Sequence, residues 1–163
     1  MSDPWTRGWL ADRRFGGWAR LRSVESVAAA PASPGVYAVV HDAAEPIEWV
    51  RNCGGWFKGR DPSVTSDRLK ANWVCGASTV YIGKAVVLRR RLREFARFGN
   101  GAAVGHWGGR LVWNLPRPDD LRVGWRLAES ESKALAEEAR LIAEFRDFFG
   151  KPPFANRPER NGT

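Results

Sequence analysis

The chain has 163 residues, enough for one domain with a buried core and too few for two large ones. Apolar residues make up 44% of it and charged residues 27%, and no apolar run approaches the roughly 20 residues of a membrane-spanning helix. The first residues lack the apolar core of a signal peptide, so we expect a cytoplasmic protein with no membrane partner. Cys53 and Cys75 have no His or Cys at metal-ligand spacing, which argues against a zinc site or a disulfide.

The net charge of +8 is unevenly distributed. Residues 81–118 contain 8 basic residues and a single acid, Glu94, whereas the segments before and after are nearly balanced. Such a localised excess is typical of a surface that binds nucleic acid or another polyanion. A solvated basic surface with no partner is the alternative.

Residues 1–33 are rich in Trp, Arg and Gly and end in an Ala/Pro/Ser run, so we interpret them as an N-terminal extension and expect the core to start after them. Short β-branched runs at 35–40 and 79–82 predict two strands, the second closed by Gly83. The segment between them, about 42–78, contains Gly and Pro breakers and is interpreted as an insertion. A helix is predicted within it, after Thr65 or Ser66 as the cap.

The second half of the chain alternates helix and strand. Leu and Phe recur at helical spacing after residue 83 and predict a helix that stops near Gly99. Strict alternation predicts a strand over 121–127, and 130–149 has helical periodicity that ends at Gly150. No internal repeat is present.

Glu138 is a carboxylate on the apolar side of the last predicted helix. At roughly 100° per residue it points to the middle of an apolar stripe, whereas Glu137 and Glu144 point to the solvated side. The stripe consists of Leu135, Leu141, Ile142, Phe145 and Phe149. A buried carboxylate must be paired, protonated or bound to a metal. A structural ion pair and a metal site are therefore both open for Glu138.

The arginines of the preceding predicted helix differ in direction. Arg91 lies roughly 65° from the apolar stripe of that helix and borders its buried face, Arg89 lies about 90° away, and Arg90 and Arg93 point nearly opposite. If the helix extends back to Lys84, Lys84 and Arg91 share an edge and can clamp one phosphate. A helix N-terminus at this turn would then lie beside that phosphate.

The chain contains only two tyrosines, and each falls in a predicted strand. Tyrosine suits strands in general, so this placement alone decides nothing. In order, however, the chain contains Gly35-Val36-Tyr37, then Tyr81-Ile82-Gly83-Lys84, then Arg91, a glutamate on a late helix, and Asn156 after a Pro-rich turn. This pattern resembles the GIY-YIG nuclease family. Residues 81–92 and 138–142 look much like the corresponding segments of the bacterial excision-repair incision subunit.

The resemblance implies an α/β fold of the α+β type, with a small central, mostly antiparallel sheet flanked by helices, and a nuclease domain over 34–163. It implies a metal-dependent DNA endonuclease that hydrolyses phosphodiester bonds. Glu138 would hold a single divalent cation, and one carboxylate with waters suits Mg²⁺ or Mn²⁺. Tyr37 and Tyr81 would activate or position water, with Lys84 and the metal as candidate helpers, and Arg91 would stabilise the phosphate.

Two further site residues are less constrained. Asn156 would bind near the phosphate or brace the site, and a structural turn role is the alternative. His106 lies in a glycine-rich loop, where an active-site role and an ordinary loop role are both open. Candidate nucleic-acid contacts from the basic segment are Lys84, Arg89, Arg90, Arg93, Arg97 and Arg110.

The expected partner is DNA, which could be structured or damaged, and the expected oligomeric state is a monomer or weak dimer. The insertion departs from the family's short hairpin; it is either a specificity or lid element or a sign of another strand register for Tyr37. Its aromatic and basic residues could stack on nucleic acid, or its tryptophans could be buried. Two other functions remain open, a non-catalytic nucleic-acid-binding module of the same fold and a protein-interaction domain.

Overall fold

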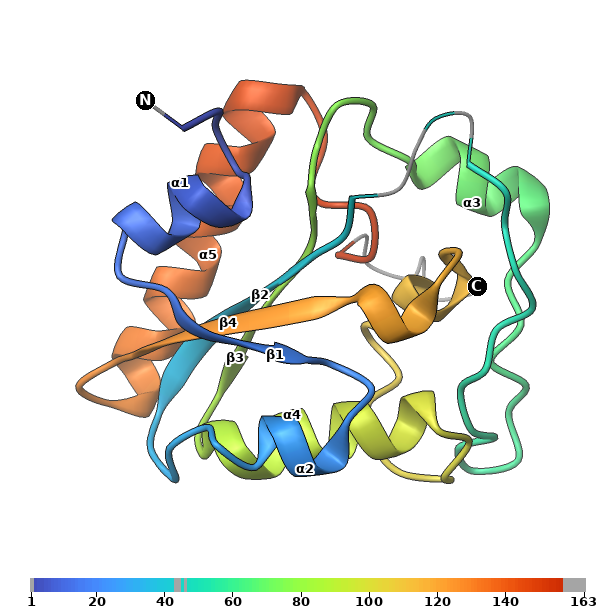
Figure 1. Ribbon diagram of the computed structural model, residues 1–163, viewed down its shortest axis with the longest axis horizontal. Coiled ribbons are helices and arrows are strands. Elements are labelled where there is room, and N and C mark those ends of the chain that lie inside the picture. The colour runs from blue at the N-terminus through green and yellow to red at the C-terminus, as the bar shows by residue number, and fades with distance from the viewer. Residues whose placement is uncertain (1, 43–44, 46, 157–163) are drawn as a thin grey trace.

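A computed structural model describes residues 2–42, 45 and 47–156 of the chain (Figure 1). Small parts of the predicted insertion and of the predicted 34–163 domain therefore lie outside the described residues. The centre is a four-stranded antiparallel sheet in the order β1-β4-β2-β3, flanked by helices, which confirms the predicted α+β class. The strands are β1 (Gly16–Arg20), β2 (Gly35–Val40), β3 (Thr79–Ala85) and β4 (Arg122–Leu127).

Helices cover both faces of the sheet. The short α2 and the longer α4 lie against one face, and α1 and α5 lie against the other (Figure 1). The helices are α1 (Arg7–Asp12), α2 (Val24–Val27), α3 (Ser66–Asn72), α4 (Leu88–Gly99) and α5 (Glu131–Phe149), with 3-10 turns η1 (Arg110–Asn114) and η2 (Pro118–Asp120). In the described part of the chain, none of the helices combines the length and apolar character needed to span a bilayer.

Strand β2 is buried on both faces because it lies inside the sheet and packed elements cover each face. Successive side chains of a strand point to opposite faces, so its residues divide between two cores. Tyr37 and Val39 enter the core under α4, whereas Val36, Ala38 and Val40 enter the core under α1 and α5. This alternation places the Tyr37 side chain on the same side of the sheet as Tyr81.

The core begins earlier than the sequence predicted. Strand β1 pairs with β4, so residues before 33 form part of the sheet. Trp5, Leu10 and Phe15 are buried against α5 and the second face of the sheet. These residues cover apolar surface of α5 that would otherwise be exposed, while β1 occupies the edge of β4.

The boundary between β3 and α4 also differs from the prediction. The sequence predicted a strand that closes at Gly83 and a helix that could reach back to Lys84; instead β3 continues to Ala85 because Lys84 pairs with Val36 of β2. The amide of Leu88, at the start of α4, donates to the carbonyl of Ser33 at 3.0 Å. Backbone groups of the preceding loop therefore occupy the N-terminus of α4, and it is not open to a phosphate.

The remaining predicted elements are confirmed, with one correction. Helix α3 begins after Thr65, whose side chain accepts the amide of Arg68, and α5 ends at Gly150 in the left-handed conformation. Leu135 was predicted to belong to the buried stripe of α5 but is 52% exposed. Its neighbour Ala134 is buried there instead, because the small side chain lets this turn of the helix approach the sheet.

A substitution at Gly83 of β3 tests how closely the Tyr37 side chain of β2 packs against this position. A Cβ at this position would lie 2.5 Å from the Tyr37 hydroxyl oxygen and overlap its ring. We expect Gly83→Ala to lower the free energy of unfolding by about 1–3 kcal/mol, as overpacking in a core does. Urea denaturation measures the change.

The matched control is Gly16→Ala in β1, where no heavy atom lies within 4 Å of the added Cβ. This variant should unfold at nearly the wild-type urea concentration. Equal stability of the two variants would contradict the close approach of Tyr37 to Gly83.

Candidate active site

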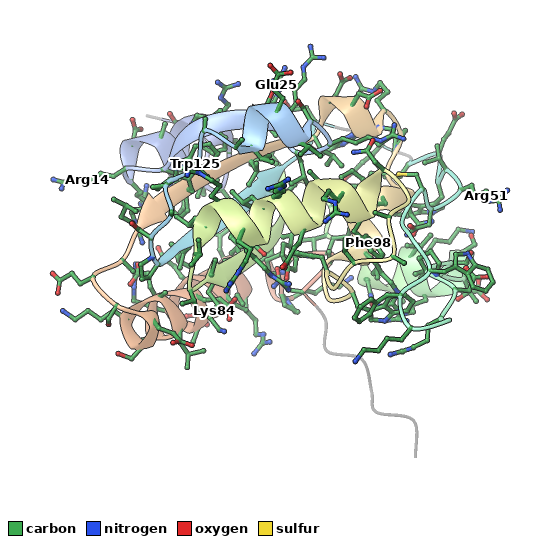
Figure 2. The ribbon with its side chains drawn as sticks, turned by 90° about the horizontal axis from the view of Figure 1, so that it is seen from below. Arg14, Glu25, Arg51, Lys84, Phe98 and Trp125 are labelled. Atoms are coloured by element: carbon green, nitrogen blue, oxygen red, sulfur yellow. The ribbon has the colours of Figure 1, made fainter. Side chains whose placement is uncertain are left out.

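Side chains from four elements converge on one pocket of about 600 Å³. Tyr37 comes from β2, Tyr81 and Lys84 from β3, Arg91 from α4 and Glu138 from α5. Figure 2 places Lys84 beside the end of α4 that follows β3, opposite the end that carries Phe98. The structure therefore brings together five of the predicted catalytic residues, which are separated by up to about a hundred positions in the sequence.

The two tyrosines lie side by side with ring centroids 6.0 Å apart. Both are buried, and both pack edge-on against Phe95 of α4. The Tyr37 hydroxyl forms a hydrogen bond of 3.0 Å with Nε2 of His106. This bond joins β2 to a residue 69 positions later and brings His106 into the site.

His106 is fully buried and stacked on Phe95, with ring centroids 3.6 Å apart and an interplanar angle of 17°. Burial, and then the positive charge of Arg91, lower the pKa of His106 well below its ordinary value. The imidazole is therefore neutral at physiological pH. With the proton on Nδ1, which has no hydrogen-bond partner in another described residue, Nε2 accepts the Tyr37 hydroxyl proton.

The tyrosines are held in their neutral form. Burial raises the pKa of Tyr37 well above its ordinary value and the adjacent Tyr81 raises it further, while Arg91 lowers it. Burial also raises the pKa of Tyr81, and Arg91 again opposes the change. The cation that acts on the phenols is thus Arg91, whereas the sequence had suggested Lys84.

Arg91 is fixed at the edge of the pocket by its backbone and side-chain partners. Its Nη1 donates to the carbonyl of Gly105 at 2.6 Å and lies 3.4 Å from Glu94 Oε2. Gly105 directly precedes His106, so the same loop holds both Arg91 and the imidazole. Glu94 lines the pocket and was not predicted as a site residue. Its signal in the sequence was its position three residues after Arg91, as the single acid of the basic segment.

Glu138 is the unpaired carboxylate of the pocket. Burial raises its pKa, and the ammonium and backbone amide of Lys84, followed by Arg91, oppose the rise. Among the described residues, no Lys or Arg forms an ion pair with Glu138, although the sequence left this possibility open. A half-buried carboxylate without a matched cation is a high-energy group that a bound cation would stabilise.

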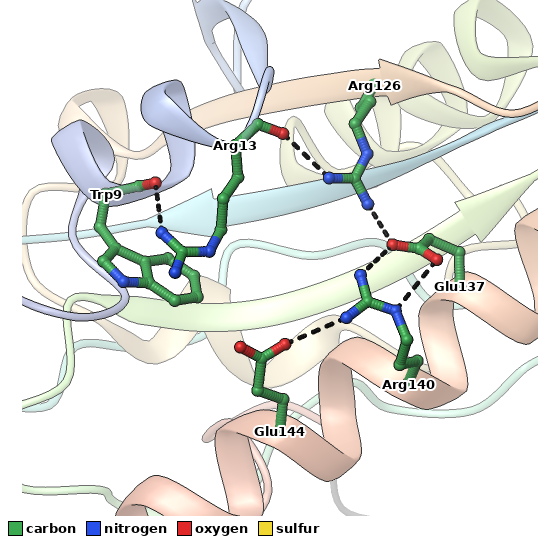
Figure 3. A network of polar contacts seen from close by, with 6 residues as sticks. All are labelled: Trp9, Arg13, Arg126, Glu137, Arg140 and Glu144. Atoms are coloured by element: carbon green, nitrogen blue, oxygen red, sulfur yellow. Dashed lines mark hydrogen bonds and ion pairs between the residues drawn. The ribbon is translucent and has the colours of Figure 1, made fainter.

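The neighbouring Glu137 has the structural role instead. It forms ion pairs with Arg126 of β4 and Arg140 of α5, and Arg140 also reaches Glu144 at 3.3 Å (Figure 3). Arg126 further donates to the carbonyl of Arg13, so the network joins α5, β4 and the end of α1 (Figure 3). Hydrogen bonding by Arg140 lowers the pKa of Glu137. Two adjacent carboxylates of one helix thus have opposite environments.

The donor set of the pocket suits a cation that keeps most of its waters. Among the described residues, no three His, Cys, Asp or Glu side chains gather around one point. Glu138 offers a hard carboxylate oxygen beside a roomy polar pocket. Mg²⁺ is commonly bound in this way, through one or two carboxylates with waters and substrate phosphates as the other ligands. The residues present fit such an ion.

Asn156 lies outside the pocket and braces its strand. The side-chain amide donates to the carbonyl of Ile82 at 2.7 Å and accepts the amide of Ile82 at 2.8 Å. Both bonds lie next to Tyr81 on the outer edge of β3. These two bonds brace the strand, which is one of the three roles considered for Asn156, beside binding near the phosphate and a structural turn.

The predicted nucleic-acid contacts lie in different environments. Arg90, Arg93 and Arg97 are exposed and share one face of α4. Arg89 is also exposed, and its Nε donates to the carbonyl of Ala30 at 2.9 Å. Arg110 is buried, with its guanidinium 4.4 Å from the centre of the Trp107 ring, and so does not offer its charge at the surface.

The fold and the pocket define a small α+β protein with a site built from two tyrosines, an arginine and an unpaired carboxylate. No family model matches the chain, and no curated protein matches it. Among solved structures, it is similar to the GIY-YIG N-terminal endonuclease domain of UvrC from Thermotoga maritima bound to its catalytic divalent cation, magnesium. The two are 19% identical, and the alignment covers 82% of this chain and 93% of that chain with a TM-score of 0.41. That domain belongs to the family that the motifs of this chain resemble. A likeness of this size assigns no role to any residue of this chain.

The histidines give a test of the electrostatics. The chain has two, and burial lowers the pKa of both, more strongly for His106 than for His41. In NMR titrations, both imidazoles should therefore titrate below about pH 6.5, with His106 the lower of the two. Assignment follows from His41→Gln, which removes one of the two signals.

The same shifts have a consequence for stability. The unfolded chain takes up protons below about pH 6.5 that the folded protein does not bind, so acidification below that pH should destabilise it. Each histidine contributes a slope of up to about 1.4 kcal/mol per pH unit. A titration of His106 at or above the ordinary value would contradict its burial beside Arg91.

Proposed function

We propose that the chain is a divalent-metal-dependent DNA endonuclease of the GIY-YIG type that hydrolyses phosphodiester bonds. The observation that carries the proposal is the contrast between two glutamates of α5. Glu137 forms ion pairs with Arg126 and Arg140. Glu138 forms none among the described residues and lines the pocket with Tyr37, Tyr81 and Arg91. An unpaired carboxylate beside cationic and phenolic groups is arranged for catalysis rather than for stability.

Arg91 and Lys84 supply the positive charge for a phosphate. Arg91 is pre-oriented by the Gly105 carbonyl and Glu94, so it needs little reorganisation when charge develops on the phosphoryl oxygens. Lys84 lines the same pocket from β3, beside Glu138. The phosphate would therefore lie between α4 and the end of β3.

Tyr37 and His106 form a hydrogen-bonded pair that orients the attacking water. The raised pKa of Tyr37 argues against a free phenolate at neutral pH. The hydroxyl can instead accept a hydrogen bond from the attacking water while it donates its own proton in the hydrogen bond to Nε2 of neutral His106, 3.0 Å away. Both groups stay neutral, because burial raises the pKa of the phenol and lowers that of the imidazole. Tyr81, packed beside Tyr37, positions the water.

A Mg²⁺ or Mn²⁺ ion bound to Glu138 would supply Lewis-acid stabilisation of the phosphate oxygens. The partner is DNA, and the basic residues at the surface of α4 are the contacts for its backbone. A monomer or weak dimer and a cytoplasmic location stay predictions. The rival function, a nucleic-acid-binding module without activity, differs in one respect: it requires no unpaired Glu138.

Adjacent glutamates provide the test of the metal ligand. We expect Glu138→Gln to abolish nicking of supercoiled plasmid in Mg²⁺ or Mn²⁺ while leaving the free energy of unfolding unchanged or slightly higher, because burial already disfavours its charge. The matched Glu137→Gln variant should keep its activity. It should lose up to about 1 kcal/mol of stability at neutral pH, since its ion pairs are partly exposed.

Plasmid gels with and without a chelator, together with urea denaturation, measure both effects. Nicking that persists in chelator or in Glu138→Gln would overturn the metal mechanism. Tight DNA binding by the wild type without cleavage of any substrate would favour the non-catalytic module.

Arg91 is tested against another arginine of the same helix. Arg91→Lys cannot contact the Gly105 carbonyl and the Tyr37 hydroxyl at once as a planar guanidinium does, so we expect a loss of about 10²-fold or more in the cleavage rate. Arg93→Lys, on the exposed face, should keep a rate within about twofold of the wild type. Equal losses in both variants would show that general basicity, rather than the placement of Arg91, supports activity.

A further inference from the structure

The insertion between β2 and β3 contains a segment that ends in a tight turn near Gly105, which we call the finger (residues 51–60). Its tip is a four-residue turn in which the Arg60 amide donates to the Phe57 carbonyl at 3.0 Å. The central residues, Lys58 and Gly59, have φ of 52° and 72°, as in a type I′ turn. A lysine rarely adopts this conformation, and strained positions of this kind cluster at functional sites.

The finger is anchored to the part of the fold that holds the site. Buried Asn52 donates to the carbonyl of Arg110 and to the Asn114 side chain, both at 2.8 Å. The amide of Gly55 donates to the carbonyl of Phe98 at the end of α4, at 3.0 Å. The Phe57 ring approaches Gly105, whose carbonyl holds Arg91. The finger is therefore fixed beside the loop that carries His106.

The exposed side of the finger is cationic and aromatic. Its ten residues include Arg51, Lys58 and Arg60 and no acidic residue. The guanidinium carbon of Arg60 lies 4.7 Å from the centre of the Trp107 ring. Trp107 directly follows His106 in the chain. Trp56 is 58% exposed, although the other eight tryptophans are buried or half-buried in the folded protein. An exposed indole among positive charges is the arrangement used to bind single-stranded nucleic acid.

A row of arginines connects the finger to the pocket. Arg90 lines the pocket, and Arg93 and Arg97 follow on the same exposed face of α4, over about 10 Å of helix. In Figure 2, α4 runs from the side of Lys84 to Phe98, and Arg51 lies beyond the Phe98 end. The charges thus form one track from the proposed phosphate site to the finger.

We propose that the finger is a second contact for the nucleic acid, in which Trp56 stacks on a base that is not enclosed in a duplex. The inference rests on the proposed function for the pocket and specifies its substrate class: DNA with a gap, flap or other single-stranded segment next to the cleaved bond. Bases inside a continuous duplex are covered on both faces by their neighbours, so the indole has no free face to contact. The phosphates of the same strand follow the arginine row of α4.

Binding to two matched DNAs tests the finger. Affinities are measured in chelator for a continuous duplex and for the same duplex with a short single-stranded gap. We expect Trp56→Ala to weaken binding to the gapped DNA about tenfold, as loss of one base–aromatic stack does, and to change binding to the duplex by less than about twofold. Trp56→Phe should restore most of the affinity, because a phenyl ring also stacks.

Phe148→Ala is the control, since Phe148 is equally exposed at 58% but lies on α5, outside the pocket and the finger. It should leave both affinities unchanged. The inference about the finger is wrong if Trp56→Ala weakens binding to both DNAs equally or to neither of them. It is also wrong if Trp56→Phe does not restore the affinity for gapped DNA.

The finger and the endonuclease activity can fail independently in these experiments. Metal-dependent nicking by the wild type with no effect of Trp56→Ala would overturn the finger alone and favour a protein contact for the exposed indole. Binding to gapped DNA that depends on Trp56, without cleavage of any DNA, would support the finger and overturn the endonuclease. Failure of the wild type to bind either DNA would overturn both.

Discussion

The pairing of β2 with β3, in which Tyr37 lies opposite Gly83, is the constraint on which the site depends. Side chains of a strand alternate between faces, so a slip of one residue would send Tyr37 into the core under α5 and away from Tyr81. Gly83 maintains the register because the Tyr37 ring occupies the space of its missing side chain. The short glycine-containing motif is therefore a packing requirement as well as a signature: the tyrosine of one strand lies over the glycine of the next.

Burial sets the protonation states of the site. Tyr37, Tyr81 and His106 are removed from water and held neutral, and Arg91 at the rim is the permanent positive charge beside them. The low polarity of the surroundings strengthens the hydrogen bond between Tyr37 and His106 and disfavours a phenolate or an imidazolium at either end of it. In the same pocket, burial raises the pKa of Glu138, and Lys84 and Arg91 oppose that rise. The pocket is thus assembled from groups whose ordinary ionisation the fold has altered, which is a frequent property of catalytic sites.

Much of this arrangement was predictable from the sequence where local periodicity governs. The apolar spacing of α4 distinguished Arg91 from its neighbours, and that of α5 identified Glu138 as facing the interior. The prediction that Glu137 faces solvent was wrong, because its side chain is only 29% exposed and pairs with Arg126 of β4. Strand β1 was missed because a bulge at Gly17 and Trp18, both with positive φ, removes the two-residue alternation that identifies a strand. The hydrogen bond of His106, the burial of Arg110 and the true end of β3 depend on contacts between residues far apart in the chain, which local patterns do not encode.

The brace formed by Asn156 has a topological consequence. Strand β3 is at the edge of the sheet, and Asn156 and Ala155 occupy its outer hydrogen-bonding groups at Ile82 and Val80. An open edge is the usual place where a strand of a second molecule adds to a sheet. Here the backbone amide of Ala155 and the side-chain amide of Asn156 form the hydrogen bonds that such a strand would otherwise form. The bond between Asn156 and Ile82 spans 74 positions, so the outer side of the strand that carries Tyr81 is completed by a segment far away in the sequence. The order of the pocket is therefore coupled to the docking of a segment that contributes no side chain to it.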